Sequence, residues 1–290
     1  MNILDDFKLQ YRTGDVTQKL IFWNVGIALP FFVIQSFFPS LFGILKDWLC
    51  LSSDFKIAAV KPWTLITYAF LHADFWHLLF NMIVLNFTSR LFLTYFTQKQ
   101  FFGLYLLGGV FAGLVFVLAD LFLHSNTFLV GASGAIMAVL IASATYAPFS
   151  EIRLLLIGNV KLWHIALVLF VLDLIQVPMS NTGGHLAHLG GSLFGFLYIK
   201  TLQQGTDLSK IVSNVIDYFV SLFSPKKTTP FKKVHKNASP QYNSTKVTVE
   251  KSSTTQKKID EILDKISKSG YDSLTKEEKD FLFKVGDNNK

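Results

Sequence analysis

Six apolar stretches constrain this chain more than any other feature of its sequence. They cover approximately residues 20–38, 76–96, 101–123, 133–148, 162–179 and 185–202. About 20 apolar residues cross a hydrocarbon core of roughly 30 Å as a helix. Inside that core every backbone polar group needs a partner within the protein, which helices provide. The sequence therefore predicts an all-α, polytopic membrane protein with a bundle of six transmembrane helices.

The charged residues are distributed unevenly along the chain. Only 16% of its 290 residues are charged, whereas soluble globular proteins have about 25%. Residues 1–204 have a net charge of +2 and residues 205–290 a net charge of +5. The chain thus combines a long apolar body with a polar, basic tail. A single cysteine, Cys50, excludes an internal disulfide and a cysteine-rich metal site.

Basic residues in the short loops predict the orientation in the membrane. Lysine or arginine occurs in residues 1–19, between the second and third stretches, between the fourth and fifth, and at the end of the sixth. The loops 124–132 and 180–184 contain neither. Because basic loops face the cytoplasm, we expect a plasma (inner) membrane protein of bacterial type with both termini cytosolic. The first external loop, 39–75, is long for a connector, and its residues 41–51 suit the membrane interface.

Polar residues at membrane depth are costly and are therefore candidates for function. Four stand out, namely His77, Asn81, Ser133 and His188. At about 1.5 Å per residue, Ser133, His188 and Asn81 lie roughly 22, 18 and 22 Å above the cytosolic ends of their helices. The similar depths predict one common site.

Small residues provide a way to bring two of these groups together. From 134 to 142 a glycine or alanine occurs at every fourth position, and glycines 191 and 195 share the helix face of His188. Such smooth faces let two helix backbones approach closely. We expect this contact to bring the imidazole of His188 to the hydroxyl of Ser133.

The residue types then indicate the chemistry. Serine is a weak nucleophile until a neighbouring base takes its proton, which His188 could do. Ser133 begins a helix, where free backbone N–H groups favour a developing oxyanion. His77 and Asn81 are four residues apart on one helix face and could donate further hydrogen bonds to it.

In residues 15–204 the chain resembles the rhomboid intramembrane serine proteases. The motifs are His-Leu-Leu-Phe-Asn at 77–81, Gly-Ala-Ser-Gly at 131–134 and Ala-His-Leu-Gly-Gly at 187–191, followed by Gly195. The resemblance implies that Ser133 is the nucleophile and His188 the general base. It also implies that His77, Asn81 and the backbone N–H of Ser133 stabilise the oxyanion. Family members cleave other membrane proteins in or near a transmembrane segment, without a metal or organic cofactor.

Three departures from the family pattern affect these expectations. Trp63 is followed by Thr64 rather than by the arginine common in the family, and Arg90 is not followed by the usual glutamate. Met137 stands four residues after the nucleophile, where an aromatic ring often supports the imidazole. We expect altered bracing of the first loop and altered support of His188, since a thioether also packs on a ring.

Several other ionisable residues are further candidates for the site. His185 shares a helix face with His188 and is the alternative base, but it lies nearer the loop. Asp120 and Asp173 could complete a triad. Asp120, however, falls near the outer interface, and Asp173 lies within the fifth stretch with no spacing relation to His188, so a Ser133–His188 dyad is preferred. His72 and His164 are expected to have structural roles.

The polar tail divides into two parts. The first part, residues 205–258, is expected to begin with an amphipathic helix over 211–223 that lies on the inner membrane surface. A disordered linker with nine lysines and one acid should follow and be attracted to anionic lipid. Residues 259–290 predict a small cytosolic helical hairpin, with a capping box of Thr275 and Glu278. No nucleic-acid-binding motif accompanies the basic charge, so transmembrane substrates and membrane lipid are the expected partners.

Two other functions compete with proteolysis. A non-catalytic rhomboid-like protein would bind or escort transmembrane clients in the same grooves, and a small-solute transporter would use the polar groups as a pathway. The presence of both Ser133 and His188 favours the protease.

Overall fold

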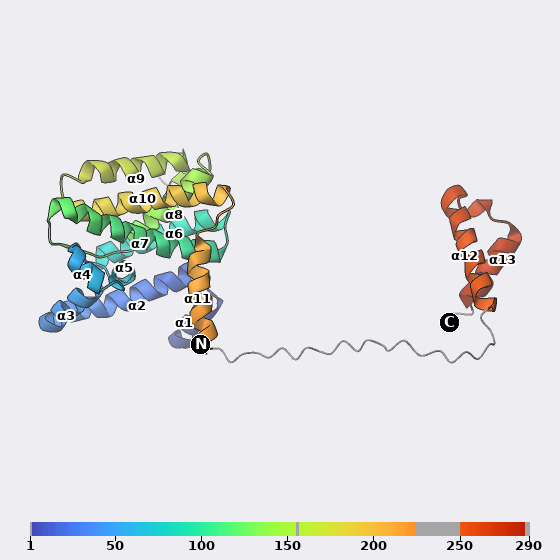
Figure 1. Ribbon diagram of the computed structural model, residues 1–290, viewed down its shortest axis with the longest axis horizontal. Coiled ribbons are helices and arrows are strands. Elements are labelled where there is room, and N and C mark those ends of the chain that lie inside the picture. The colour runs from blue at the N-terminus through green and yellow to red at the C-terminus, as the bar shows by residue number, and fades with distance from the viewer. Residues whose placement is uncertain (1, 155–156, 224–249, 288–290) are drawn as a thin grey trace. The chain divides into compact units, whose positions relative to one another are not determined.

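The structure, a computed structural model, describes residues 2–154, 157–223 and 250–287. It divides into two compact units, Met1–Lys227 and Thr228–Lys290, which are treated separately (Figure 1). The first unit contains six long helices at the expected stretches. These are α2 (Val16–Phe37), α6 (Phe75–Leu93), α7 (Gln98–Leu123), α8 (Ser133–Tyr146), α9 (Leu162–Gln176) and α10 (Thr182–Gln203). Each end lies within four residues of the end expected from hydropathy.

Helix α8 lies at the centre of this bundle. It packs against α6, α7, α9 and α10, and ten of its fourteen residues are buried. The small residues of α8 explain its position, because a narrow helix accommodates close neighbours on several sides. A Cβ atom at Gly191 of α10 would collide with the carbonyl oxygen of Gly134, and one at Gly195 with the carbonyl oxygen of Ala138. The backbones of α8 and α10 are therefore in direct contact.

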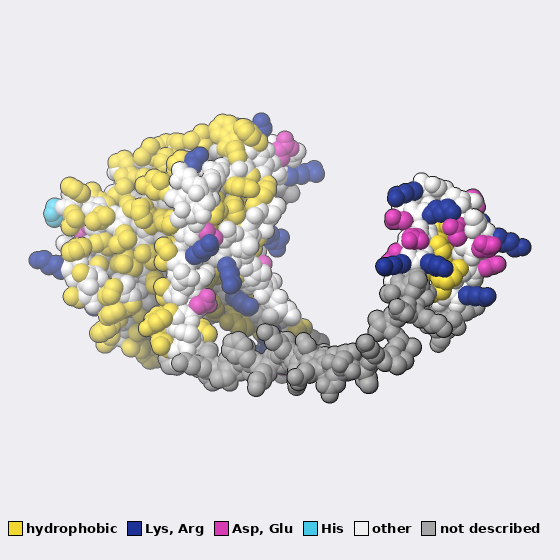
Figure 2. All heavy atoms as spheres, turned by 45° about the vertical axis from the view of Figure 1, so that its right-hand side comes forward, with side chains coloured by type: hydrophobic (Ala, Val, Ile, Leu, Met, Phe, Trp, Pro, Cys, Tyr) yellow, Lys and Arg dark blue, Asp and Glu magenta, His cyan; other side chains and the backbone are white. Residues whose placement is uncertain are grey.

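The outer surface of the bundle is strongly apolar. Figure 2 shows hydrophobic side chains over much of the visible face of the first unit, and large ones such as Phe37, Phe122 and Phe149 are 72–86% exposed. Among the described residues, α2 and α7 are long and apolar enough to cross a membrane. Helix α6 passes this test only together with Thr64–Phe70, at a bend of 96°, and α8 and α9 are shorter apolar helices. A mainly helical membrane bundle is thus confirmed, whereas six crossings stay a prediction.

The unit is mainly helical, as expected, and it also contains two small antiparallel sheets. Strand β1 (Leu51–Ser52) pairs with β2 (Phe128–Leu129), and β3 (Glu151–Leu154) pairs with β4 (Gly158–Lys161). These connections leave backbone N–H and C=O groups outside any helix, and pairing satisfies them. The β1–β2 pair has a consequence for the site, since it ties the first loop to the segment that leads into Ser133.

The long first loop is folded rather than extended. It contains α3 (Pro39–Leu49), α4 (Phe55–Val60), α5 (Thr64–Thr67) and the short 3-10 helix η1 (Tyr68–Phe70). The indole of Trp63 stacks on that of Trp48 at 5.6 Å and donates a hydrogen bond to the Trp48 carbonyl. Lys61 donates to the carbonyl of Asp47, and the hydroxyl of Thr64 donates to the carbonyl of Lys61. These contacts brace the loop where the family often has an arginine.

Helix α1 (Ile3–Thr13) precedes the bundle, and α11 (Ser209–Phe223) follows it. Helix α11 packs against α7, where Gly103 leaves room for Ser209. Asp207 accepts hydrogen bonds from the backbone and hydroxyl of Ser209 and from the hydroxyl of Tyr198. The start of α11 is thus fixed to the bundle, while its apolar side chains Ile211, Val215 and Phe219 are exposed.

The second unit is a helical hairpin of α12 (Glu250–Ser269), η2 (Tyr271–Ser273) and α13 (Lys276–Asp287). The expected capping box is present, with Thr275 N–H donating to Glu278 and Glu278 N–H donating to the Thr275 hydroxyl. Lys265 of α12 forms a 2.9 Å ion pair with Glu278. The hairpin begins nine residues earlier than expected, at Glu250, so the predicted linker is too long at that end. The rest of the predicted linker, 224–249, lies outside the described residues.

Candidate active site

The four polar residues singled out from the sequence line one cavity of about 730 Å³. His77 and Asn81 come from α6, Ser133 from the start of α8 and His188 from α10. Aliphatic and aromatic side chains, including Phe80 and Leu172, form much of the remaining wall. A few convergent polar groups in an apolar cavity are typical of a ligand or substrate site.

Ser133 and His188 are in direct contact. The hydroxyl oxygen of Ser133 lies 2.6 Å from Nε2 of His188, a distance that corresponds to a strong hydrogen bond. The close α8–α10 packing brings the two side chains together. Ser133 is the first residue of α8, so its N–H has no carbonyl one turn earlier to bond. The nucleophile candidate therefore has both a base and a free backbone donor beside it.

The position of His77 is fixed by hydrogen bonds at the start of α6 and by the close approach of Gly131. The N–H of His77 donates to the carboxylate of the N-cap residue Asp74, and the N–H of Ala73 donates to Nδ1 of the imidazole. Since Nδ1 accepts, the proton is on Nε2. Gly131 has φ +117°, and a Cβ there would lie 2.8 Å from the His77 ring and 3.7 Å from the Ser133 hydroxyl. Glycine thus lets the backbone pass between these two side chains.

Asn81 lies one turn further along α6. Its side-chain amide donates to the carbonyl of His77 at 2.8 Å, and the residue is 7% exposed and lines the cavity. One amide hydrogen is used within the helix, which leaves the second as a possible donor to a bound group.

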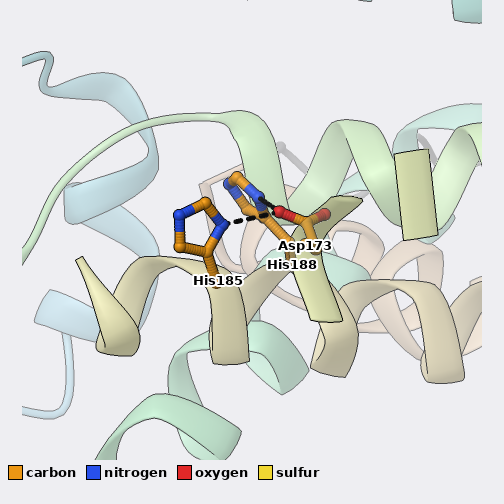
Figure 3. A group of neighbouring side chains, drawn as sticks. All are labelled: Asp173, His185 and His188. Carbon is orange, nitrogen blue, oxygen red and sulfur yellow. Dashed lines mark hydrogen bonds and ion pairs between the residues drawn. The ribbon is translucent and has the colours of Figure 1, made fainter. Parts of the chain in front are cut away.

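Asp173, which sequence reasoning considered and set aside, lies in contact with His188. Its carboxylate oxygen Oδ1 lies 2.8 Å from Nδ1 of His188 and 2.8 Å from Nδ1 of His185 (Figure 3). The preference for an isolated dyad is therefore incomplete as a description of the geometry. Asp173 comes from α9 and both histidines from α10, so the sequence separation of 15 residues carried no signal. Only a buried carboxylate within an apolar helix pointed to it.

This group is also where ligand atoms for a metal converge. The Asp173 oxygen and the two imidazole nitrogens all lie within 4.8 Å of one another. Direct hydrogen bonds already account for the arrangement, because a carboxylate oxygen accepts from two N–H groups. The tautomer of His188 follows: Nδ1 carries the proton and donates to Asp173, so Nε2 accepts from the Ser133 hydroxyl.

The remaining candidates occupy different surroundings. His72 is buried beside His77, with ring centroids 5.2 Å apart, and burial together with this neighbour lowers the pKa of His72 to about 3. Asp120 is bonded by the backbone N–H of Ser125 in the loop after α7. His164 is exposed and packs on Trp163. Met137 is 7% exposed and lines the same cavity as His188.

The geometry is suited to nucleophilic attack on a carbonyl group. Nε2 of His188 accepts from the Ser133 hydroxyl, Asp173 accepts from Nδ1 of the same ring, and His77 lines the same cavity. Such a site is recognised by roles and distances rather than by sequence order.

Comparison with known proteins finds two family matches along the chain. The Rhomboid domain family matches residues 59–205, which include all the cavity's polar groups named above. A family of unknown function (DUF6576) matches residues 240–284, in the second unit.

Three curated relatives illustrate the similarity. Presenilin-associated rhomboid-like protein A, mitochondrial, of Danio rerio is 34% identical over 137 residues, which cover 45% of this chain and 35% of that protein. Rhomboid protein 1, mitochondrial, of Saccharomyces cerevisiae is 27% identical over 62% of this chain and 52% of its own. RHOMBOID-like protein 12, mitochondrial, of Arabidopsis thaliana is 25% identical over 66% and 59%. The chain spans between about a third and 60% of these relatives.

The comparisons correct one expectation. A plasma membrane of bacterial type with cytosolic termini was inferred from the basic loops, but the relatives named above are mitochondrial proteins. The positive-inside pattern reports on which side a loop lies and not on which membrane contains it. The expected location is therefore wrong.

Proposed function

This chain belongs to the rhomboid family, and we propose that it is an intramembrane serine endopeptidase that hydrolyses peptide bonds in or near transmembrane segments of other membrane proteins. The observation that carries the proposal is the 2.6 Å contact between Ser133 Oγ and His188 Nε2 inside an apolar cavity. Packing at a helix start does not by itself require an imidazole beside the serine hydroxyl.

In the proposed reaction, His188 takes the hydroxyl proton as Ser133 Oγ attacks the carbonyl carbon. The tetrahedral intermediate then collapses, the C–N bond breaks, and His188 returns the proton to the leaving amine. A water molecule, activated by the same imidazole, hydrolyses the acyl-enzyme and restores the serine. No further reactant is needed.

The oxyanion of the intermediate would accept hydrogen bonds from the backbone N–H of Ser133 and from Nε2–H of His77. The tautomer of His77 supports this role, because its Nδ1 accepts from the N–H of Ala73. Asn81 would contribute its second amide hydrogen. One such donor is worth about 10²–10³ in kcat.

The substrate class follows from the surroundings of the cavity. Its wall is largely apolar, and the bundle around it presents large hydrophobic side chains outward, so a transmembrane polypeptide fits better than a polar one. We propose six crossings, with α2 and α7 as the helices whose length and hydropathy support this most directly. A mitochondrial membrane is the location supported by the relatives' names.

Cleavage of a single-span reporter, co-expressed with the full chain, tests the proposal. Ser133→Ala and His188→Ala should each abolish the cleaved product while the protein stays inserted in the membrane. A fluorophosphonate probe should label the purified wild type at Ser133 and leave Ser133→Ala unlabelled. Product formation undiminished in Ser133→Ala would overturn the assignment, and a wild type that neither cleaves nor labels would indicate the non-catalytic client-binding alternative.

A further inference from the structure

We propose that Asp173 is a positioning residue that acts through His188, so that the base is oriented by a carboxylate from a third helix, α9. This inference rests on the proposed function and adds a group to the pair of residues that perform it. Figure 3 shows the carboxylate of Asp173 facing the imidazoles of His185 and His188.

The geometry gives Asp173 a defined task. Its Oδ1 lies 2.8 Å from Nδ1 of His188, and Nε2 of the same ring lies 2.6 Å from the Ser133 hydroxyl. The carboxylate accepts the Nδ1–H, which keeps the lone pair of Nε2 directed at the serine. It also faces the imidazolium that forms when His188 takes the proton, and an anion at this distance stabilises that charge.

Burial indicates that the carboxylate is not present for packing. Asp173 is 6% exposed, and the other residues of α9 that are buried are Leu162 and Ala166. A buried carboxylate costs several kcal/mol unless its partners compensate. An apolar residue would pack at this position without that cost, so the two imidazole donors explain why an acid is tolerated here.

His185 is the second donor to the same oxygen. Its Nδ1 lies 2.8 Å from Asp173 Oδ1, and its side chain is 12% exposed. Because His185 bonds the same oxygen from the neighbouring turn of α10, it helps to fix the direction in which Asp173 points. His185 therefore contacts the positioning residue Asp173 rather than the reacting atoms. This contact explains why a second histidine shares the helix face of His188.

The first measurement is the pH profile of fluorophosphonate labelling and of reporter cleavage by the full chain in detergent or lipid. Asp173→Asn should lower kcat by about 10²- to 10⁴-fold with a change in KM below about threefold. The acid limb of the profile should move to lower pH, because the imidazolium loses its anionic neighbour. Among the described residues that line the cavity, the ionisable and nucleophilic groups around His188 are Ser133 on α8, Asp173 on α9, His185 on α10 and His77 on α6, and Asp173 is the one carboxylate.

Asp120→Asn is the matched control. Asp120 is also a buried carboxylate, 8% exposed, but it accepts from Ser125 and lies on α7. This change removes a buried negative charge without touching the imidazoles. It should leave kcat and the acid limb unchanged.

Thermal unfolding of the same variants separates positioning from folding. Asp173→Asn should lose activity while unfolding close to the wild-type temperature, because its effect passes through the imidazole of His188. A fall in Tm that parallels the loss of activity would show a structural role and overturn the inference, as would a wild-type-like profile for Asp173→Asn in a chain whose Ser133→Ala variant is inactive. Chelator treatment should leave activity unchanged; activity that requires added Zn²⁺ would instead assign the three side chains to a metal. If the wild type itself is inactive, the proposed function fails first, and the two failures are thereby distinguished.

Discussion

The Cα atom of Gly191 on α10 lies against the carbonyl oxygen of Gly134 on α8, with no space for a methyl group between them. Gly134 directly follows Ser133 and Gly191 lies about one turn after His188, so this contact sets the distance between the two side chains. This backbone contact is possible because Gly191 has no side chain, while the missing side chain of Gly134 makes room for Ala112 of α7. The reactivity of the site and the packing of its two helices therefore depend on the same glycines.

Gly191→Ala should destabilise the bundle by about 3 kcal/mol, because overpacking forces two rigid backbones apart. Thermal unfolding in detergent measures this as a lower Tm, and fluorophosphonate labelling should fall with it. Gly109→Ala is the control, since a Cβ there meets its nearest neighbour, Ala135, at an ordinary 3.5 Å. Equal losses in the two variants would contradict the proposed contact.

Gly131→Ala should lower kcat roughly 10²-fold, the usual effect of disturbing one oxyanion donor. The added methyl group would press on the His77 ring and would also require a residue other than glycine at φ +117°. Gly158→Ala separates these causes, because Gly158 also has a positive φ of +89° but open space around it. We expect some loss of stability and normal kinetics in the Gly158 variant. A normal kcat in Gly131→Ala would mean that His77 does not need its present position.

Acid should destabilise the first unit through His72. Burial, together with the nearby His77 ring, lowers the pKa of His72 from 6.5 to about 3, so the unfolded chain binds the proton first. The contribution of His72 to the free energy of unfolding is fully present above pH 6.5. It falls as the pH decreases toward 3, by at most about 1.4 kcal/mol per pH unit.

Chemical unfolding at a series of pH values measures this slope. His72→Leu should reduce it between pH 6 and pH 4, whereas His124→Asn, at an exposed loop position, should leave it unchanged. An unaltered slope in His72→Leu would assign the acid sensitivity to other groups.

Asp207 should fix the beginning of α11 to the bundle. Burial alone would raise the pKa of Asp207, but hydrogen bonds from Ser209, Tyr198 and Gln100 outweigh it and lower the pKa. Asp207→Ala removes the acceptor for the backbone of Ser209, a loss comparable to that of a helix cap, about 1 kcal/mol. Hydrogen exchange of α11 should accelerate while that of α8 stays slow.

The Asp207 contact also makes stability depend on pH, here because hydrogen bonds favour the charged carboxylate, whereas burial favours the neutral form of His72. The lowered pKa means that the stabilisation is present above the ordinary aspartate range and is lost as the pH falls through the folded value. Asp217→Ala, at an exposed position within α11, is the control for helix propensity. Slow exchange retained in Asp207→Ala would show that packing against Gly103 suffices to hold the helix.

The sequence by itself determined the helices, the motif residues and the small-residue faces. These are local properties: hydropathy over about 20 residues sets a helix, and a spacing of three or four residues sets a face, whatever surrounds it. For this reason each helix end lies within four residues of expectation, and His77, Asn81, Ser133 and His188 line one cavity.

Only the tertiary structure decided that α9 packs beside His188 of α10 and brings a carboxylate to its imidazole. The approach of Asp173 to His185 and His188 depends on the packing of α9 against α10, and no spacing within either helix encodes that distance. The β1–β2 pair and the Trp48–Trp63 stack are likewise contacts between distant segments. Periodicity along the chain determines which residues share a face, whereas side-chain volume and backbone approach between helices determine which faces meet.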